Sequence, residues 1–375
     1  MPNDNRRFKT DTNRRAFLKA TGGIAAAGTL AGCLGSQGSE NDQNTSKSGD
    51  KKQTDFPTKP ITFIIPYGPG GGYDFYTRLL VQVLNQKDII PVQAKAKNVA
   101  GSGGMVATNQ VYNAEPTGYT NMIINTESFA IAQLARPEAA RYQLQKMTAL
   151  PRVAGTIRTI GVSTATDITT AEEFNQALKN GEINIGNMGP TTTDAVMLKV
   201  LAVLGGEATF SLKDYNQNAV TFDSRGGMFT ALKRGSIDAM AGSFASLYKY
   251  VKSGDLRYVW VYTKKEHCPK GTKNSKCDTF ATFNGEIPNV DQIIALSGGP
   301  YHRIFTGPPG IPENRHTYLC EKITKAIKNP LFQQQAKKAN RPIKYGDCQL
   351  ADKAIEQTVQ TYKDNKNLLK KLDLI

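Results

Sequence analysis

A three-part unit recurs along this chain and sets its fold class: a short apolar strand, a loop rich in glycine, serine or threonine, and then a helix. In the first copy, the apolar run Pro60–Pro66 leads through the glycines of 68–72 into a helix predicted for Asp74–Gln86, with Asp74 as its N-cap. This alternation is typical of α/β proteins with mostly parallel sheets. Later strands are predicted at 91–96, 120–125, 182–186, 220–222 and 237–241, and later helices at 105–114, from Thr126 onward, at 195–204 and at 228–233.

Four of the loops between a strand and a helix have a composition that suits an anion. They lie around Gly70, Ser102, Thr192 and Gly226. Ligands of open α/β sheets bind at the carboxyl ends of the strands, where each helix begins with unpaired N–H groups and a partial positive charge. One such loop alone is equally consistent with a tight turn. The four together predict one shared anion pocket.

These loops lack the signatures of nucleotide sites and of hydrolases. The run 101–104 does not complete G-x-G-x-x-G with an acidic residue about 20 positions later, and no Gly-Lys-Ser/Thr follows either glycine-rich loop. A G-x-S-x-G nucleophile elbow is also absent, and His267, His302 and His316 follow no recognisable nucleophile. We therefore expect a binding protein without a cofactor, and not an enzyme. A hydrolase that uses paired carboxylates stays the alternative.

The chain is strongly basic. Its 375 residues include 47 Lys and Arg against 32 Asp and Glu, which gives a net charge of +15. Residues 1–33 hold six basic and two acidic side chains, so the remaining chain carries +11. This excess favours an anionic ligand or an anionic membrane surface. Nucleic acid is not a predicted partner, because the chain has no basic helix, RNP-like aromatic pattern or zinc-finger spacing.

The first residues predict export and lipidation. Arg14 and Arg15 precede a mildly apolar stretch, Ala20–Leu30, that is too short for the roughly 20 residues of a membrane-spanning helix. This order is typical of a twin-arginine signal peptide. The stretch ends in Leu30-Ala31-Gly32-Cys33, which resembles a lipobox with Cys33 as the lipidated residue. We predict a signal peptide at 1–33, a flexible polar tether at 34–55 and a location outside the cytoplasmic membrane, held there by the lipid.

Four further cysteines agree with an oxidising compartment. An even number of cysteines outside the cytoplasm predicts two disulfides, of which Cys268–Cys277 and Cys320–Cys348 are the preferred pairs among three possible pairings. Free buried thiols are the alternative. No metal site is predicted, because the cysteines form no C-x-x-C pair and histidine is scarce, although His267 lies beside Cys268.

Six stretches between residues 56 and 375 give the chain a specific family resemblance. Their residues and order resemble the substrate-binding receptors of tripartite tricarboxylate transporters, the Bug-type extracytoplasmic solute receptors. The combination is far more specific than any one motif. The stretches are Phe56–Ile61 with Ile65-Pro66-Tyr67-Gly68-Pro69-Gly70-Gly71-Gly72-Tyr73-Asp74, then Asn98–Gly104, Glu115–Thr120, Asn184–Thr193, Gly235–Ala239 and Gly307–Pro312.

The resemblance implies a two-domain, periplasmic-binding-protein-like (type II) clamshell with mostly parallel or mixed sheets and crossover hinge strands. Domain 1 would comprise 56–157 and 263–375, and domain 2 would comprise 158–262. The implied function is capture of a small carboxylate (a di- or tricarboxylate, an aromatic acid or an acidic amino acid) by a monomeric receptor for the membrane subunits of a transporter. A receptor that signals through a membrane partner would need the same clamshell and stays an alternative.

The resemblance also implies a set of ligand-binding residues. Arg225 occupies a position where the family usually has Lys, and it either grips a second carboxylate or lies on the surface. Glu127 is a departure that either meets a cationic group on the ligand, pairs with an arginine or caps its helix. The implied set is Tyr67, Gly68, Gly70 and Asp74; Ala100, Gly101, Ser102 and Gly103; Thr126 and Glu127; Thr191, Thr192 and Thr193; Arg225 and Gly226; and Ser243.

Overall fold

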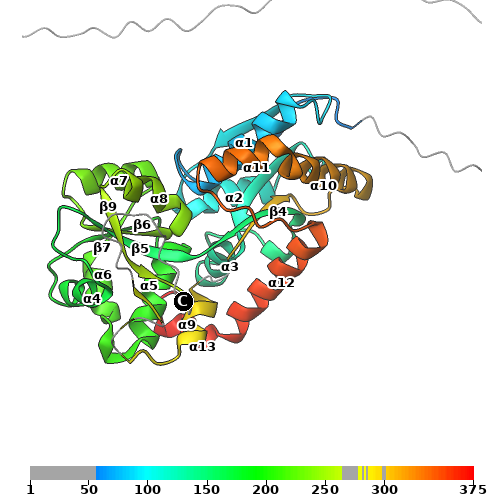
Figure 1. Ribbon diagram of the computed structural model, residues 1–375. Coiled ribbons are helices and arrows are strands. Elements are labelled where there is room, and N and C mark those ends of the chain that lie inside the picture. Colours follow the sequence, from blue (N-terminus) through cyan, green and yellow to red (C-terminus); the bar gives the residue numbers. More distant parts are fainter. Residues whose placement is uncertain (1–55, 264–277, 281–282, 284–285, 298–300) are drawn as a thin grey trace, which may run out of the picture. The chain divides into compact units, whose positions relative to one another are not determined.

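Two β-sheets organise the protein. The computed structural model describes residues 56–263, 278–280, 283, 286–297 and 301–375. Figure 1 shows the strands and the helices that cover them. The first sheet has the order β2-β1-β3-β11-β4, with β1 (Ile61–Ile65), β2 (Ala94–Asn98), β3 (Thr120–Asn125), β4 (Thr148–Thr156) and β11 (Tyr301–Gly307). The second has the order β10-β9-β5-β8-β6-β7, with β5 (Arg158–Ser163), β6 (Ile185–Asn187), β7 (Ala219–Thr221), β8 (Ala239–Ser243), β9 (Leu256–Val261) and β10 (Asp278–Thr279).

The helices follow the strands as the sequence predicts. β3 has the predicted bounds, and the predicted helices at 105–114, 195–204 and 228–233 correspond to α2, α5 and α7. The α-helices are α1 (Gly72–Gln86), α2 (Met105–Tyr112), α3 (Thr126–Ala135), α4 (Ala171–Lys179), α5 (Thr193–Leu204), α6 (Leu212–Asn218), α7 (Arg225–Lys233), α8 (Phe244–Lys252), α9 (Val290–Leu296), α10 (Glu313–Lys328), α11 (Pro330–Lys338), α12 (Cys348–Asp364) and α13 (Lys366–Lys371). Short 3₁₀ helices lie at Ser102–Gly104, Leu144–Lys146 and Gly206–Ala208.

One predicted helix start is wrong. α1 begins at Gly72 with Gly71 as N-cap, so Asp74 lies in the first turn and is not the N-cap. Its carboxylate folds back on the preceding loop and accepts a hydrogen bond from the Gly70 amide at 3.1 Å. The same carboxylate accepts from Arg78 at 2.8 Å. A negative side chain in the first helical turn is favoured by the helix dipole, which explains this position.

Both sheets are mixed, as predicted. β1 pairs in parallel with β2 and β3, whereas β11 is antiparallel to β3 and β4. In the second sheet, β6 is parallel to β7 and β8, whereas β5 is antiparallel to β8 and β9. A single residue, Ile157, separates β4 from β5, so the chain crosses from one sheet to the other almost without a loop. The second sheet continues beyond residue 262 with β10, and the domain boundaries stay a prediction.

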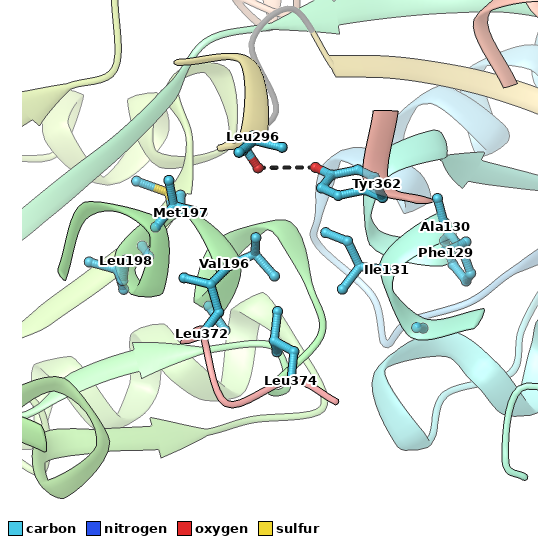
Figure 2. Close-up of a cluster of buried hydrophobic side chains, with 14 of the residues drawn as sticks. Phe129, Ala130, Ile131, Val196, Met197, Leu198, Leu296, Tyr362, Leu372 and Leu374 are labelled. Atoms are coloured by element: carbon cyan, nitrogen blue, oxygen red, sulfur yellow. Dashed lines mark hydrogen bonds between the residues drawn. The ribbon is translucent and has the colours of Figure 1, made fainter. Parts of the chain in front are cut away.

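A buried apolar cluster joins elements of both sheets near this crossing. Figure 2 shows side chains from α3 beside others from α5, with Tyr362 of α12 and the last residues of the chain between them. The Tyr362 hydroxyl donates to the carbonyl of Leu296 at 3.0 Å. Lys199 of α5 donates to the carbonyl of Asp373 at 3.1 Å. The C-terminal segment therefore packs against helices of both sheets.

A disulfide joins Cys320 of α10 to Cys348 at the start of α12. This is the pairing preferred from the sequence, and it closes a loop in the segment that leads to the C-terminal helices. Cys268 and Cys277 lie outside the described residues, as do the predicted signal peptide, Cys33 and the tether. Of the helices that the structure describes, none combines the length and apolar composition that a bilayer crossing requires.

The C-terminal packing yields a stability prediction. Leu372 is 1% exposed in the joint cluster, whereas Ile375, three residues later, is 38% exposed. We expect Leu372→Ala to lower the free energy of unfolding by about 2–4 kcal/mol, because it leaves a cavity in a packed core. Ile375→Ala is the matched control and should change it by less than about 0.5 kcal/mol. Urea unfolding measures both, and equal effects of the two variants would contradict the packing role.

Candidate functional site

A small cavity lies where the loops of the two sheets meet. Its volume is about 50 Å³, several times the roughly 10–15 Å³ that a single water requires. The lining residues come from the carboxyl ends of β1, β3, β6 and β8, the helices that follow these strands, helix α7, and strands β5 and β11. They are Tyr67, Gly68, Gly71, Gly72, Tyr73, Asn125, Ser128, Arg158, Met188, Thr192, Thr193, Asp194, Arg225, Ser243, Ser246 and Arg303.

Five helices of the described chain begin at this lining: α1, α3, α5, α7 and α8. The N-caps of α7 and α8 are serines whose hydroxyls accept from amides of the first turn. The N-caps of α1, α3 and α5, which are Gly71, Asn125 and Thr192, make no such side-chain bond. Because the first amides of a helix lack intrahelical partners, these starts present donors and a partial positive charge to the cavity.

A buried charge cluster forms one wall. Asp194, in the first turn of α5, makes ion pairs with Arg158 of β5 and with Arg225 of α7. The Arg225 guanidinium also donates to the carbonyl of Ala241. Each of the three charged side chains is less than a tenth exposed. Such a pair needs further hydrogen bonds to offset its desolvation, and the contact with Ala241 supplies one.

Arg303 of β11 forms the opposite wall. Its Nε donates to the side chain of Asn125 at 3.2 Å, and its guanidinium lies over the rings of Tyr73 and Tyr76 at 4.7 and 5.2 Å. A Cβ on Gly72 would collide with this guanidinium, so a larger residue there would displace the Arg303 side chain. With three guanidinium groups and one carboxylate, the lining carries a formal charge of +2.

The loops of the two sheets touch and cover the cavity. The Gly68 amide donates to the carbonyl of Asp223 at 3.4 Å, and a Cβ on Gly68 would lie 2.7 Å from that of Ser224. The Thr193 amide donates to the Ser128 hydroxyl at 2.9 Å. These bonds join the β1 and β3 sides of the cavity to the β6 and β7 sides. The conformation is therefore a closed one.

Six of the sixteen predicted ligand-binding residues line the cavity: Tyr67, Gly68, Thr192, Thr193, Arg225 and Ser243. Arg225 is buried and ion-paired, not a surface residue. The other ten predicted residues are outside the lining: Gly70, Asp74, Ala100, Gly101, Ser102, Gly103, Thr126, Glu127, Thr191 and Gly226.

The second glycine loop supports the cavity from outside its lining. The Tyr67 hydroxyl donates to the carbonyl of Gly103 at 2.8 Å. Burial raises the pKa of Tyr67 well above its ordinary value, so this hydroxyl keeps its proton and acts as a donor. Gly103 has a φ of 64°, which glycine adopts without strain. The loop therefore orients Tyr67, which does line the cavity.

Glu127 turns away from the cavity toward the crossing between the sheets. It accepts a hydrogen bond from the backbone amide of His302 at 3.2 Å, and its neighbour Thr126 accepts one from Thr358 of α12. Burial raises the pKa of Tyr362, also of α12, and the nearby carboxylate of Glu127 raises it further. Burial raises the pKa of Glu127 itself to about 7.

Sequence reasoning missed the main charged groups. Arg158, Asp194 and Arg303 all line the cavity, yet none was among the predicted residues. Arg158 and Arg303 are buried residues of strands that also hold buried apolar side chains, and a charge in a buried strand is a signal that could have identified them. Asp194 follows three threonines at a helix start, and its role depends on arginines distant in sequence.

One group outside the cavity has residue types that bind metals. His316, Cys320 and Cys348 lie within 4.8 Å of one another. The two sulfurs, however, are joined in a disulfide and are not thiolates, the form that binds metals. His316 Nε2 lies 2.8 Å from the Ala149 carbonyl, so its ring is also engaged. These residues do not fit a metal site in this oxidised form.

Most of the chain matches one known protein family. The sequence pattern of the tripartite tricarboxylate transporter family receptors matches residues 80–374. The chain belongs to this receptor family. It is accordingly a solute-binding receptor and not an enzyme.

Individual relatives of this receptor are distant. A UPF0065 protein of Pseudomonas sp. (strain P51), from the tcbD-tcbE intergenic region, is 23% identical over 293 residues, which cover 76% of this chain and 79% of the relative. The structure of the periplasmic binding protein BugD superposes with a TM-score of 0.67 at 17% identity, covering 85% of this chain and 99% of BugD. The structure of MatC of Rhodopseudomonas palustris with bound malate superposes with a TM-score of 0.65 at 16% identity, covering 82% of this chain and 99% of MatC. These likenesses confirm the predicted fold class.

The buried carboxyl of Glu127 predicts a pH-dependent stability. Its folded pKa of about 7 exceeds the ordinary 4.5, so the folded receptor holds a proton that the unfolded chain releases between these values. Stability is therefore lost as pH rises from about 4.5 to 7. The glutamine of Glu127→Gln stays neutral, so this variant should lack this pH dependence. Its free energy of unfolding at pH 8 should exceed that of the unchanged receptor by on the order of 1–3 kcal/mol. Urea unfolding at pH 5, 6, 7 and 8 measures it.

The exposed Glu356→Gln on α12 is the matched control and should keep the slope of the unchanged receptor. Identical pH profiles for Glu127→Gln and the unchanged receptor would contradict the buried, protonated state of Glu127.

Proposed function

We propose that the receptor binds a small carboxylate in the closed cavity, that a ligand with two carboxylates suits it best, and that it delivers this solute to the membrane subunits of a tripartite tricarboxylate transporter. One observation carries the proposal: five helix starts and three arginines line one small cavity. Helix starts and guanidinium groups are both complementary to carboxylate oxygens.

The charge of the lining favours a dianion. Asp194 offsets one of the guanidinium groups, and the remaining +2 would be neutralised by a ligand with two carboxylates. A neutral sugar would add no negative charge to this lining, whereas a dianion is complementary to its formal charge. The malate-bound MatC structure shows that this fold accommodates a dicarboxylate.

The two walls have different roles in this proposal. Arg303 presents its guanidinium from the first sheet, held by Asn125 and the ring of Tyr73. Arg158 and Arg225 belong to the second-sheet wall, where Asp194 fixes their orientation. A dicarboxylate that contacts both walls would stabilise the closed conformation relative to an open one, because only closure brings both sets of donors to the ligand. The hydroxyls of Ser128 and Thr193 already bridge the two sides.

The location follows from the first residues. We propose that the twin-arginine signal directs export, that Cys33 is lipidated, and that residues 34–55 tether a monomeric receptor outside the cytoplasmic membrane, at the periplasmic face. The basic surplus of +11 after residue 33 would keep this tethered receptor near anionic lipids. Mass spectrometry of the membrane-bound protein tests the anchor, because Cys33 lipidation adds a defined mass to the new N-terminus.

Removal of the Arg303 guanidinium tests the ligand class. We expect Arg303→Gln to lower the affinity of the receptor for a C4–C6 dicarboxylate by about 10- to 100-fold, because charge-assisted hydrogen bonds are lost. The affinity of Arg303→Lys should fall between those of the unchanged receptor and Arg303→Gln, since lysine keeps the charge but lacks the planar guanidinium. Arg234→Gln, on an exposed arginine outside the cavity, is the control and should bind like the unchanged receptor. Titration calorimetry at pH 7 measures all four proteins.

Two results would contradict the proposal. Unchanged dicarboxylate affinity in Arg303→Gln would show that this guanidinium does not contact the ligand. A receptor that binds neutral sugars and no carboxylate would show that the charge of the cavity does not select the ligand.

A further inference from the structure

A second concavity lies on the surface, outside the ligand cavity. It is a groove of about 420 Å³ between the start of α8 and the segment that includes the end of α11 and the residues after it. Figure 1 labels both helices. Phe244 and Ala245 form one wall, and Ala336, Lys337, Arg341 and Ile343 belong to the other. Apolar side chains contribute to both walls, the exposed Lys337 lies at the rim, and no acidic residue lines the groove.

Both walls are fixed to helices that begin at the ligand cavity. On the α8 wall, Ser243 and Ser246 line the cavity, while Phe244 and Ala245, between them in sequence, line the groove. The other wall is held to α1: the Tyr76 hydroxyl donates to the carbonyl of Pro342 at 2.7 Å. α1 in turn begins at Gly72 in the cavity lining.

The groove thus depends on closure. α8 follows a strand of the second sheet, whereas α1 follows one of the first. When the cavity is closed, the starts of α1 and α8 lie at one small site, and this brings the two walls of the groove together. Any opening that separates those helix starts must also widen the groove. Its shape therefore reports whether the ligand cavity is closed.

The charge around the groove indicates the chemistry of its partner. Residues 322–344, which include the α11 wall, contain seven basic and no acidic side chains. Lys337 is exposed at the rim, and Phe244 stacks on Tyr258 at 4.4 Å, which gives the α8 wall a rigid aromatic face. An exposed lysine beside apolar walls, in a segment without acidic residues, is complementary to an acidic peptide segment with an apolar side chain.

We propose that this groove docks an acidic segment of the transporter's membrane subunits and does so in the closed receptor. The inference rests on the proposed function, because that function supplies the partner. Docking at a surface shared by both walls selects the closed receptor, since an open receptor does not present both walls at the same spacing. The complementary charges also speed the encounter of the two proteins.

Charge reversal at the rim tests the docking. Cells that lack the receptor are supplied with the full chain or with Lys337→Glu, and uptake of the radiolabelled dicarboxylate that the receptor binds is measured. Lys337→Arg keeps the charge, and Lys366→Glu reverses an exposed lysine at the start of α13, far from α11 in Figure 1. Calorimetry on each purified variant checks that ligand affinity is retained.

We expect Lys337→Glu to lower the uptake rate at least about 5-fold with unchanged ligand affinity, because a like charge now faces the acidic partner. Lys337→Arg and Lys366→Glu should sustain uptake like the unchanged receptor. If Lys337→Glu also sustains full uptake, the groove is not the docking site, and the proposed function stands. If the unchanged receptor does not restore uptake, the proposed function fails and the docking inference falls with it.

Discussion

The ion pairs from Asp194 to Arg158 and Arg225 are the interaction on which the site depends. They join the start of α5, the first residue of β5 and the start of α7, three elements that are far apart in the sequence. Buried charges are costly without partners, so any packing that separates these elements would leave a guanidinium or a carboxylate unpaired. The pairs thus fix the second-sheet wall of the cavity before a ligand arrives.

The position of Arg158 links this wall to the crossing between the sheets. Only Ile157 separates it from β4, so the charge cluster begins where the chain changes sheets. The apolar cluster around Tyr362 and Leu372 lies between helices of both sheets and secures the crossing. A receptor that closes over a solute needs an ordered connection of this kind, because ligand contacts with one side must change the position of the other.

The sequence predicts the fold well because the fold depends on local patterns. Apolar runs bounded by Gly and Pro give β1 and β3, and the threonines before Asp194 give the start of α5. The site is less predictable, because its charges meet through tertiary packing. Glu127 and Ser128 show the difference. They are adjacent on α3, yet Ser128 faces the cavity and Glu127 faces the crossing, a choice set by α12 and β11.

We propose that the positive charge of the cavity selects its ligand. Titration calorimetry of the receptor with C4–C6 dicarboxylates, each compared with its uncharged diamide of the same shape, tests this most directly. We expect binding of a dicarboxylate and at least about 100-fold weaker binding of its diamide, because the diamide cannot form charge-assisted hydrogen bonds with the guanidinium groups. Equal affinity for both members of a pair, or binding of diamides alone, would contradict it.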